Sequence, residues 1–171
     1  PDSADPGHLS QLVRVLESEA DRLQRWIPYR PKAPIELHLF PFADFMRYYS
    51  QGGAAIGLFD GKVRMPFADV PSLHPQIVAI FSHEIAHALL AGATDDQAPS
   101  WFHEGLAQHI EGTQEGLNPI PGLIERGNYL TFSLIEPVLE ARAHPELVGI
   151  AYLQAQWLLH FVEDRWGADG I

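Results

Sequence analysis

The sequence contains no cysteine among its 171 residues. This absence excludes disulfide bonds and metal sites that depend on thiolate ligands, and it leaves the cellular compartment open. No uninterrupted apolar run approaches the length of a membrane-spanning helix, so we expect no direct membrane insertion.

Basic residues are also scarce, since 11 Lys and Arg oppose 22 Asp and Glu and give a net charge of −11. Such a charge argues against nucleic acid and against an anionic membrane surface as partners. A content of 46% hydrophobic and 19% charged residues is typical of a folded globular protein, and the length fits a single domain over residues 1–171. The chain begins at Pro1 without a methionine, which favours a mature or trimmed fragment of an exported or periplasmic bacterial protein.

Hydrophobic periodicity predicts a small sheet followed by helices, which is an α+β fold. A helix is expected from the Asp5-Pro6 pair to Leu23. The next predicted elements are a strand, a short helix and a hairpin that turns at Asp60-Gly61, over residues 35–40, 42–49 and 54–66. Two helices with polar motifs follow, then an irregular stretch over residues 112–127 and further helices.

Residues 83–87 read His-Glu-Ile-Ala-His. Residues four apart lie on the same face of a helix, so the imidazoles of His83 and His87 can reach one metal ion at about 2.0–2.1 Å. Glu84 falls one step round the helix, beside the ion, which suits a general base that takes a proton from a zinc-bound water. The alternative interpretation is an amphipathic helix with two surface histidines and an ordinary glutamate.

The surroundings of this motif favour metal binding. No proline interrupts residues 76–91, Ser72 can cap the helix and Gly92 can end it. The segment has an apolar face at helical spacing, made of Ile77, Ile80, Phe81, Ala88 and Leu89. Two polar imidazoles in such an apolar helix need a partner, and a metal ion is the simplest one.

A catalytic zinc site needs a third protein ligand, with water in the fourth position. The metzincin pattern requires glycine and histidine where this sequence has Leu90 and Ala93, and a deformylase-type site requires a cysteine. The remaining common choice is a carboxylate on a following helix. Residues 101–108, Trp-Phe-His-Glu-Gly-Leu-Ala-Gln, supply one after a helix start at Pro99-Ser100.

Together, residues 83–87 and 101–107 resemble the paired motifs of the gluzincin clan of zinc metallopeptidases, most closely the bacterial peptidase MA-like domains. The resemblance implies His83, His87 and Glu104 as ligands of one Zn²⁺ ion and Glu84 as the general base. It also implies a zincin-like fold in which an edge strand lies above the metal helix. We place that edge in the hairpin at residues 57–65, where an extended peptide substrate could pair with it.

The sequence departs from better-known family members at several positions. It lacks the Gly-x-Met-Glu-Asn strand of the aminopeptidases, so aminopeptidase specificity is unsupported. Thermolysin-like members have an aspartate where this sequence has Gln108, which leaves the support of a ligand histidine open. Related domains usually continue beyond the position of Ile171, which implies either a truncated or a minimal domain.

A zinc peptidase also needs a hydrogen-bond donor for the oxyanion that forms on the attacked carbonyl. We expect a helix from Ala151 to about Trp166, with Tyr152 near its start as the candidate donor. A core tyrosine with a hydrogen-bonded hydroxyl is the alternative. The expected buried side of this helix includes Leu153, Trp157, Leu158, Phe161 and Val162.

The other candidate donors are Tyr129 and then His160. His103 could reach the substrate or lie on the surface, and His109 is expected to be structural or solvated, as lone histidines usually are.

These features predict a zinc-dependent metallopeptidase of the endopeptidase type, acting on a peptide or protein. The alternative is a non-catalytic peptide- or cell-wall-binding module that keeps its zinc site. The presence of Glu84 favours the enzyme, because a structural zinc site does not require a general base.

Overall fold

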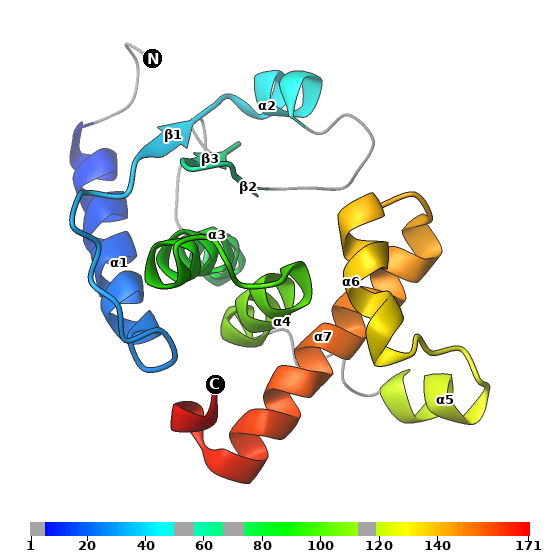
Figure 1. Cartoon of the computed structure of the whole chain (residues 1–171). Coiled ribbons are helices and arrows are strands. Elements are labelled where there is room, and N and C mark those ends of the chain that lie inside the picture. Colours follow the sequence, from blue (N-terminus) through cyan, green and yellow to red (C-terminus); the bar gives the residue numbers. More distant parts are fainter. Residues whose placement is uncertain (1–5, 50–56, 67–73, 113–118) are drawn as a thin grey trace. The chain divides into compact units, whose positions relative to one another are not determined.

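The computed structural model describes residues 6–49, 57–66, 74–112 and 119–171. Across these residues the protein is mostly helical, with seven α-helices and one three-stranded sheet (Figure 1). This architecture confirms the α+β prediction in its general form. The chain divides into two compact units, residues 1–93 and 94–171, and the expected single domain stays a prediction.

The first unit contains the sheet and three helices. The helices are α1 (Pro6–Leu23), α2 (Phe42–Tyr48) and α3 (Pro75–Thr94). The strands are β1 (Leu37–Leu39), β2 (Leu58–Phe59) and β3 (Val63–Met65), and they lie in the order β1-β3-β2. Each predicted element of this unit is therefore present, although the strands are shorter than expected. Residues 54–56 of the predicted hairpin lie outside the described residues.

The central strand β3 pairs in parallel with β1 and antiparallel with β2. The antiparallel pair turns at Gly61, whose φ of 89° lies in the left-handed region that glycine adopts without strain. Alternate strand residues point to opposite faces of a sheet. The apolar residues of β1 and β3 therefore share one face, which packs with Leu12 of α1 and Phe81 of α3 to form the core of the unit.

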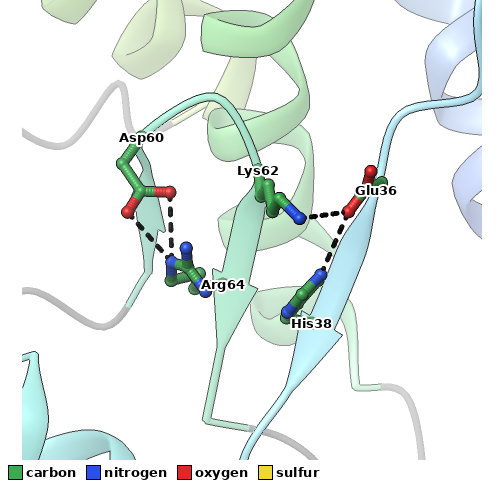
Figure 2. Close-up of polar contacts among 5 residues, drawn as sticks. All are labelled: Glu36, His38, Asp60, Lys62 and Arg64. Atoms are coloured by element: carbon green, nitrogen blue, oxygen red, sulfur yellow. Dashed lines mark hydrogen bonds and ion pairs between the residues drawn. The ribbon is translucent and has the colours of Figure 1, made fainter.

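Polar side chains on and beside the strands form a charged cluster, which consists of Glu36, His38, Asp60, Lys62 and Arg64 (Figure 2). Lys62 Nζ lies 2.6 Å from Glu36 Oε2, and His38 Nε2 lies 3.3 Å from the same oxygen. These hydrogen bonds hold the pKa of Glu36 below its usual value. Arg64 Nε donates to both Asp60 oxygens at 3.0 Å, which raises the pKa of the guanidinium. Solvent screens such exposed pairs, so they contribute little to stability.

The motif helix α3 is longer than the sequence predicted. Gly92 does not end it, because the helix continues to Thr94. A side chain at position 92 would meet the Tyr29 ring, since an added Cβ would lie 2.6 Å from Tyr29 Cε1. The absence of a side chain at Gly92 thus allows the Tyr29 ring to pack closely against α3. The predicted cap Ser72 lies outside the described residues.

By length and composition, α3 is the one helix in the described ranges that could cross a membrane. The core helix of a globular protein passes the same test, so this is weak support for a span. Its buried residues are Phe81, Ser82, Glu84, Ile85, Ala86, Leu89 and Leu90. The Ser82 hydroxyl donates to Glu19 Oε2 of α1 at 2.7 Å, a polar contact that suits a core helix packed on a neighbour.

The second unit is built around its longest helix. Its elements are α4 (Ser100–Glu111), α5 (Pro119–Glu125), α6 (Phe132–Ala141), α7 (Pro145–Trp166) and a 3₁₀ turn, η2 (Ala168–Gly170). Each of α4, α5 and α6 packs on α7 (Figure 1). The helix α5 lies within the stretch predicted to be irregular, so that prediction is wrong for residues 119–125.

The prediction for α7 is wrong in its start and in most of its buried face, although Leu158 does pack against the core. The helix begins at Pro145, where the fixed φ of proline suits a first helical position, so Tyr152 lies in its interior. The buried residues are Ala151, Ala155, Gln156 and Leu159. Trp157 and Phe161 are exposed, and their rings stack on each other. Large apolar side chains suggested a buried face, whereas close helix packing selects the small residues at positions 151 and 155.

The start of α4 at Ser100 agrees with the sequence prediction, but the residue that caps it is distant in sequence. The backbone N–H groups of Ser100 and Trp101 donate to the two carboxylate oxygens of Glu136 at 2.8 and 2.9 Å. The first N–H groups of a helix have no partner within it, and a carboxylate there also interacts favourably with the helix dipole. Glu136 of α6 therefore caps α4 in place of a local side chain.

Gly105 allows α4 and α7 to approach closely, and we predict that Gly105→Ala destabilises the second unit. An added Cβ would lie 2.7 Å from the Ala155 carbonyl oxygen, and that backbone atom cannot move without shifting α7. Overpacking of this kind costs about 1–3 kcal/mol, which exceeds the gain of roughly 0.5–1 kcal/mol from replacing glycine in a helix. Thermal unfolding should show a lower midpoint.

The matched control for this change is Gly149→Ala in the same unit. An added Cβ at position 149 of α7 meets no atom within 4 Å. The higher helix propensity of alanine should then leave the unfolding midpoint unchanged or slightly raised. Equal destabilisation by both variants would show that close packing at Gly105 does not limit stability.

Candidate metal and catalytic site

The two motif histidines lie side by side on α3, as the sequence predicted. The ring centroids of His83 and His87 are 4.8 Å apart and the ring planes meet at 77°. Both residues are partly exposed, whereas Glu84 between them is buried. The helix therefore presents two imidazoles on one accessible face and a sheltered carboxylate next to them.

The backbone of Gly57 lies directly against the Glu84 carboxylate. A Cβ added to Gly57 would overlap with Glu84 Oε1 and would lie 2.8 Å from Glu84 Cδ. Any side chain at position 57 would therefore occupy the space of this carboxylate. Sequence reasoning placed Gly57 in the hairpin but gave it no relation to Glu84, because such a contact leaves no local pattern.

Gly57 immediately precedes β2, which lies at one end of the strand order β1-β3-β2. Leu58 and Phe59 of β2 pair with Arg64 and Val63 of β3. The opposite side of β2 is thus an edge of the described sheet, and an edge strand can pair with an extended chain. The same short segment contributes a sheet edge and a contact with Glu84.

In the second unit, Glu104 is buried on α4, and its carboxylate forms an ion pair with the guanidinium of Arg142. Arg142 Nη2 donates to Glu104 Oε1 at 3.1 Å, and Arg142 Nε donates to the Leu139 carbonyl at 3.3 Å. Arg142 follows α6 with a φ of 47°, a conformation that is uncommon for any residue except glycine. The sequence gave no indication of Arg142, because only the packing of α6 near α4 brings it to Glu104.

Tyr152, the predicted oxyanion donor, packs on α7 beside the cluster of Leu130, Ile135, Leu139 and Ala151. This position agrees with the alternative of a core tyrosine, and the role of its hydroxyl stays a prediction. Tyr129 is exposed and lines a small cavity next to α5 and α7 together with Trp157. His103 is partly buried on α4.

The predicted site residues thus belong to two different units. His83, Glu84 and His87 share α3 of the first unit, and Glu104 lies on α4 of the second. The joint ligand set of His83, His87 and Glu104 stays a prediction from the sequence.

Comparison with known proteins identifies a distant relative. The chain is 26% identical over 191 aligned residues to the uncharacterized protein YhcO of Bacillus subtilis (strain 168), and the match covers 98% of this chain. The chain spans about half (56%) of the length of that relative. No protein-family model and no solved structure matches the chain.

Proposed function

We propose that this chain is a zinc-dependent metallopeptidase of the gluzincin type that cleaves peptide bonds within a chain. The observation that carries the proposal is the position of Glu84, a buried carboxylate between two partly exposed histidines and against the backbone of Gly57. A helix that only covered a core would not need a buried carboxylate next to paired imidazoles.

The donor groups on α3 and α4 suit a zinc ion. Imidazole nitrogens and a carboxylate oxygen are the ligands that catalytic zinc most often has, and the rings of His83 and His87 lie 4.8 Å apart on one helix face. We propose Glu104 as the third ligand, with Arg142 holding its carboxylate in a fixed orientation. When bound, the ion would supply Lewis acidity that lowers the pKa of a water molecule and polarises a peptide carbonyl.

Glu84 would act as the general base and then as the general acid. Its carboxylate would accept a proton from the attacking water and later deliver it to the leaving amine. Burial of Glu84 and contact with Gly57 restrict the positions that this carboxylate can adopt. Such restriction favours proton transfer, because a positioned base needs little reorganisation during the reaction.

The edge of β2 would bind the substrate as an added strand. Backbone hydrogen bonds to Leu58 and Phe59 would align an extended peptide without strong demands on its side chains. Since Gly57 continues this edge to Glu84, the bound peptide would run past the general base. This mode of binding fits an endopeptidase, because neither end of the substrate has to be recognised.

Digestion of casein and of a peptide library would test the proposal. We expect internal cleavage that a chelator stops and added Zn²⁺ restores, and N-terminal profiling of the products should show cuts away from the ends. Zinc-dependent peptide binding without any cleavage would instead support the non-catalytic binding module.

We predict that Gly57→Ala lowers peptidase activity while the protein stays folded. The new methyl group would displace the Glu84 carboxylate, which is the flexible end of a side chain, so the fold should tolerate the change. A displacement of about 1 Å can cost roughly 100-fold in rate, and we expect kcat/KM to fall by about 10–100-fold. Steady-state kinetics, unfolding midpoint and zinc content should be measured together.

Gly149→Ala is the control for this variant as well, because it adds the same methyl group at a position with no atom within 4 Å. Its kinetics should match those of the unchanged chain. Full activity of Gly57→Ala would show that contact with Gly57 does not position Glu84 for catalysis.

A further inference from the structure

We propose that the second unit contains a transition-metal site of its own, formed by His109, His160 and Glu163. His109 lies in the last turn of α4, and the other two residues lie one turn apart on α7. One nitrogen of each histidine and one carboxylate oxygen of Glu163 lie within 4.8 Å of one another. The site joins two helices that pack closely within this unit (Figure 1).

His109 and Glu163 form the sheltered half of this site. His109 Nε2 and Glu163 Oε2 are 2.7 Å apart, and the side chains are 9% and 21% exposed. A metal ion can replace the proton of such a hydrogen bond. Tetrahedral ligands about 2.0–2.1 Å from an ion are roughly 3.3 Å from each other, so the pair would need to separate by about 0.6 Å. Small side-chain rotations suffice for that change.

His160 provides a second, independent indication of a ligand. Its Nδ1 is buried and has no hydrogen-bond partner among the residues that the structure describes. A buried nitrogen without a partner costs free energy, which a cation at that position would remove. The ring centroid of His160 is 5.8 Å from that of His109.

The other nitrogen of His160 faces a carboxylate. His160 Nε2 lies 3.6 Å from Asp164 Oδ2, one helical turn further along α7. A carboxylate there favours the tautomer with its proton on Nε2, and this leaves the lone pair of Nδ1 to bind a cation. Histidines that bind metals commonly donate their second ring nitrogen to such a carboxylate.

The donor set selects the kind of ion. Two imidazole nitrogens and one carboxylate oxygen suit Zn²⁺ and neighbouring transition metals, whereas Ca²⁺ and Mg²⁺ prefer oxygen ligands alone. An ion at this site would tie the end of α4 to α7. His109 lies five residues after Glu104, about 140° away round α4, so this site is separate from the proposed catalytic centre and does not depend on it.

Zinc titration of the full chain and its variants would test the proposal. The double variant His83→Ala/His87→Ala removes the imidazole pair of α3, and we expect it to keep one equivalent of Zn²⁺. Adding His160→Ala or Glu163→Gln should weaken that binding at least roughly 100-fold, since even groups that only support a ligand contribute 10–100-fold. His144→Ala is the matched control, because it removes an exposed histidine of the same unit.

Calorimetry and metal analysis should be combined with circular dichroism to confirm that each variant is folded. A folded double variant that binds no Zn²⁺ would overturn the site, and so would binding that survives both His160→Ala and Glu163→Gln. If His160→Ala does not fold, zinc binding by Glu163→Gln decides between the two outcomes. This variant should fold, because glutamine keeps the shape of glutamate and an oxygen that can accept a hydrogen bond. The site is supported if His83→Ala/His87→Ala still binds Zn²⁺ and if adding His160→Ala or Glu163→Gln abolishes that binding. This result does not depend on whether His83 and His87 bind zinc.

Discussion

Glu84→Gln should abolish peptide hydrolysis while the chain keeps its zinc. Glutamine has nearly the same shape as glutamate, so contact with Gly57 and the buried position on α3 should be preserved. The amide cannot accept a proton from water at neutral pH, and general base catalysis typically contributes about 10²–10⁴-fold to a rate. We therefore expect kcat to fall by at least that factor, with zinc content and the unfolding midpoint unchanged.

The control for this substitution is Glu36→Gln. Glu36 belongs to the same unit and also pairs with neighbouring side chains, but it is exposed and lies beside β1, away from β2 in the strand order (Figure 2). Its loss of charge should leave hydrolysis intact. This comparison separates a catalytic carboxylate from a general effect of charge. Hydrolysis by zinc-loaded Glu84→Gln at the unchanged rate would exclude Glu84 as the base.

The variant also distinguishes two explanations of a chelator effect. If the chain holds a second zinc ion at His109, His160 and Glu163, a chelator removes both ions and could inactivate the protein by loosening α4 from α7. Glu84→Gln leaves every proposed ligand in place, so its effect reports on the chemistry at α3 alone.

Elements of the fold that depend on local sequence could be predicted. The motif helix α3, the turn at Gly61 and the start of α4 each have a periodic or turn-forming pattern within a few residues. The sequence could therefore reveal His83 and His87 as neighbours on one helix face, with Glu84 one step round the helix. Their apolar surroundings identified the buried side of α3 correctly at Phe81 and Leu89.

Features that depend on contacts between distant segments could not be predicted. The buried face of α7 follows from its close approach to Gly105, which requires Ala155 and excludes the large Trp157. Glu136 caps a helix that starts 36 residues earlier, and Arg142 holds a carboxylate 38 residues away. No pattern within a short window contains such pairs, because they exist only after the helices pack.

His109 shows the same limit at the level of function. The sequence suggested a structural or solvated residue, because no metal-binding spacing surrounds it. In the structure, His109 Nε2 lies 2.7 Å from Oε2 of Glu163, which is 54 residues further along the chain. His160 and Glu163 are three residues apart, a spacing that puts both on one helix face but is too common to predict a metal site without a third ligand from α4.

Glu104→Ala should produce the largest loss of zinc affinity at the proposed catalytic centre. The change removes one of three protein ligands, so the dissociation constant should rise at least roughly 100-fold, more than for typical supporting residues. It also leaves Arg142 without the carboxylate that it contacts at 3.1 Å. The measurement is zinc titration in the His160→Ala background, where the second proposed site no longer contributes.

Arg142→Ala and Glu146→Ala complete this experiment in the same background. Arg142 only orients Glu104, so its loss should weaken binding by about 10–100-fold, less than the loss of the ligand itself. Glu146 is an exposed carboxylate of the same unit, and Glu146→Ala controls for the change in net charge. An order in which Arg142→Ala weakens binding more than Glu104→Ala would contradict direct ligation by Glu104. If Glu104→Ala binds zinc with unchanged affinity, the third ligand must be another residue, because two imidazoles alone do not complete a catalytic zinc site.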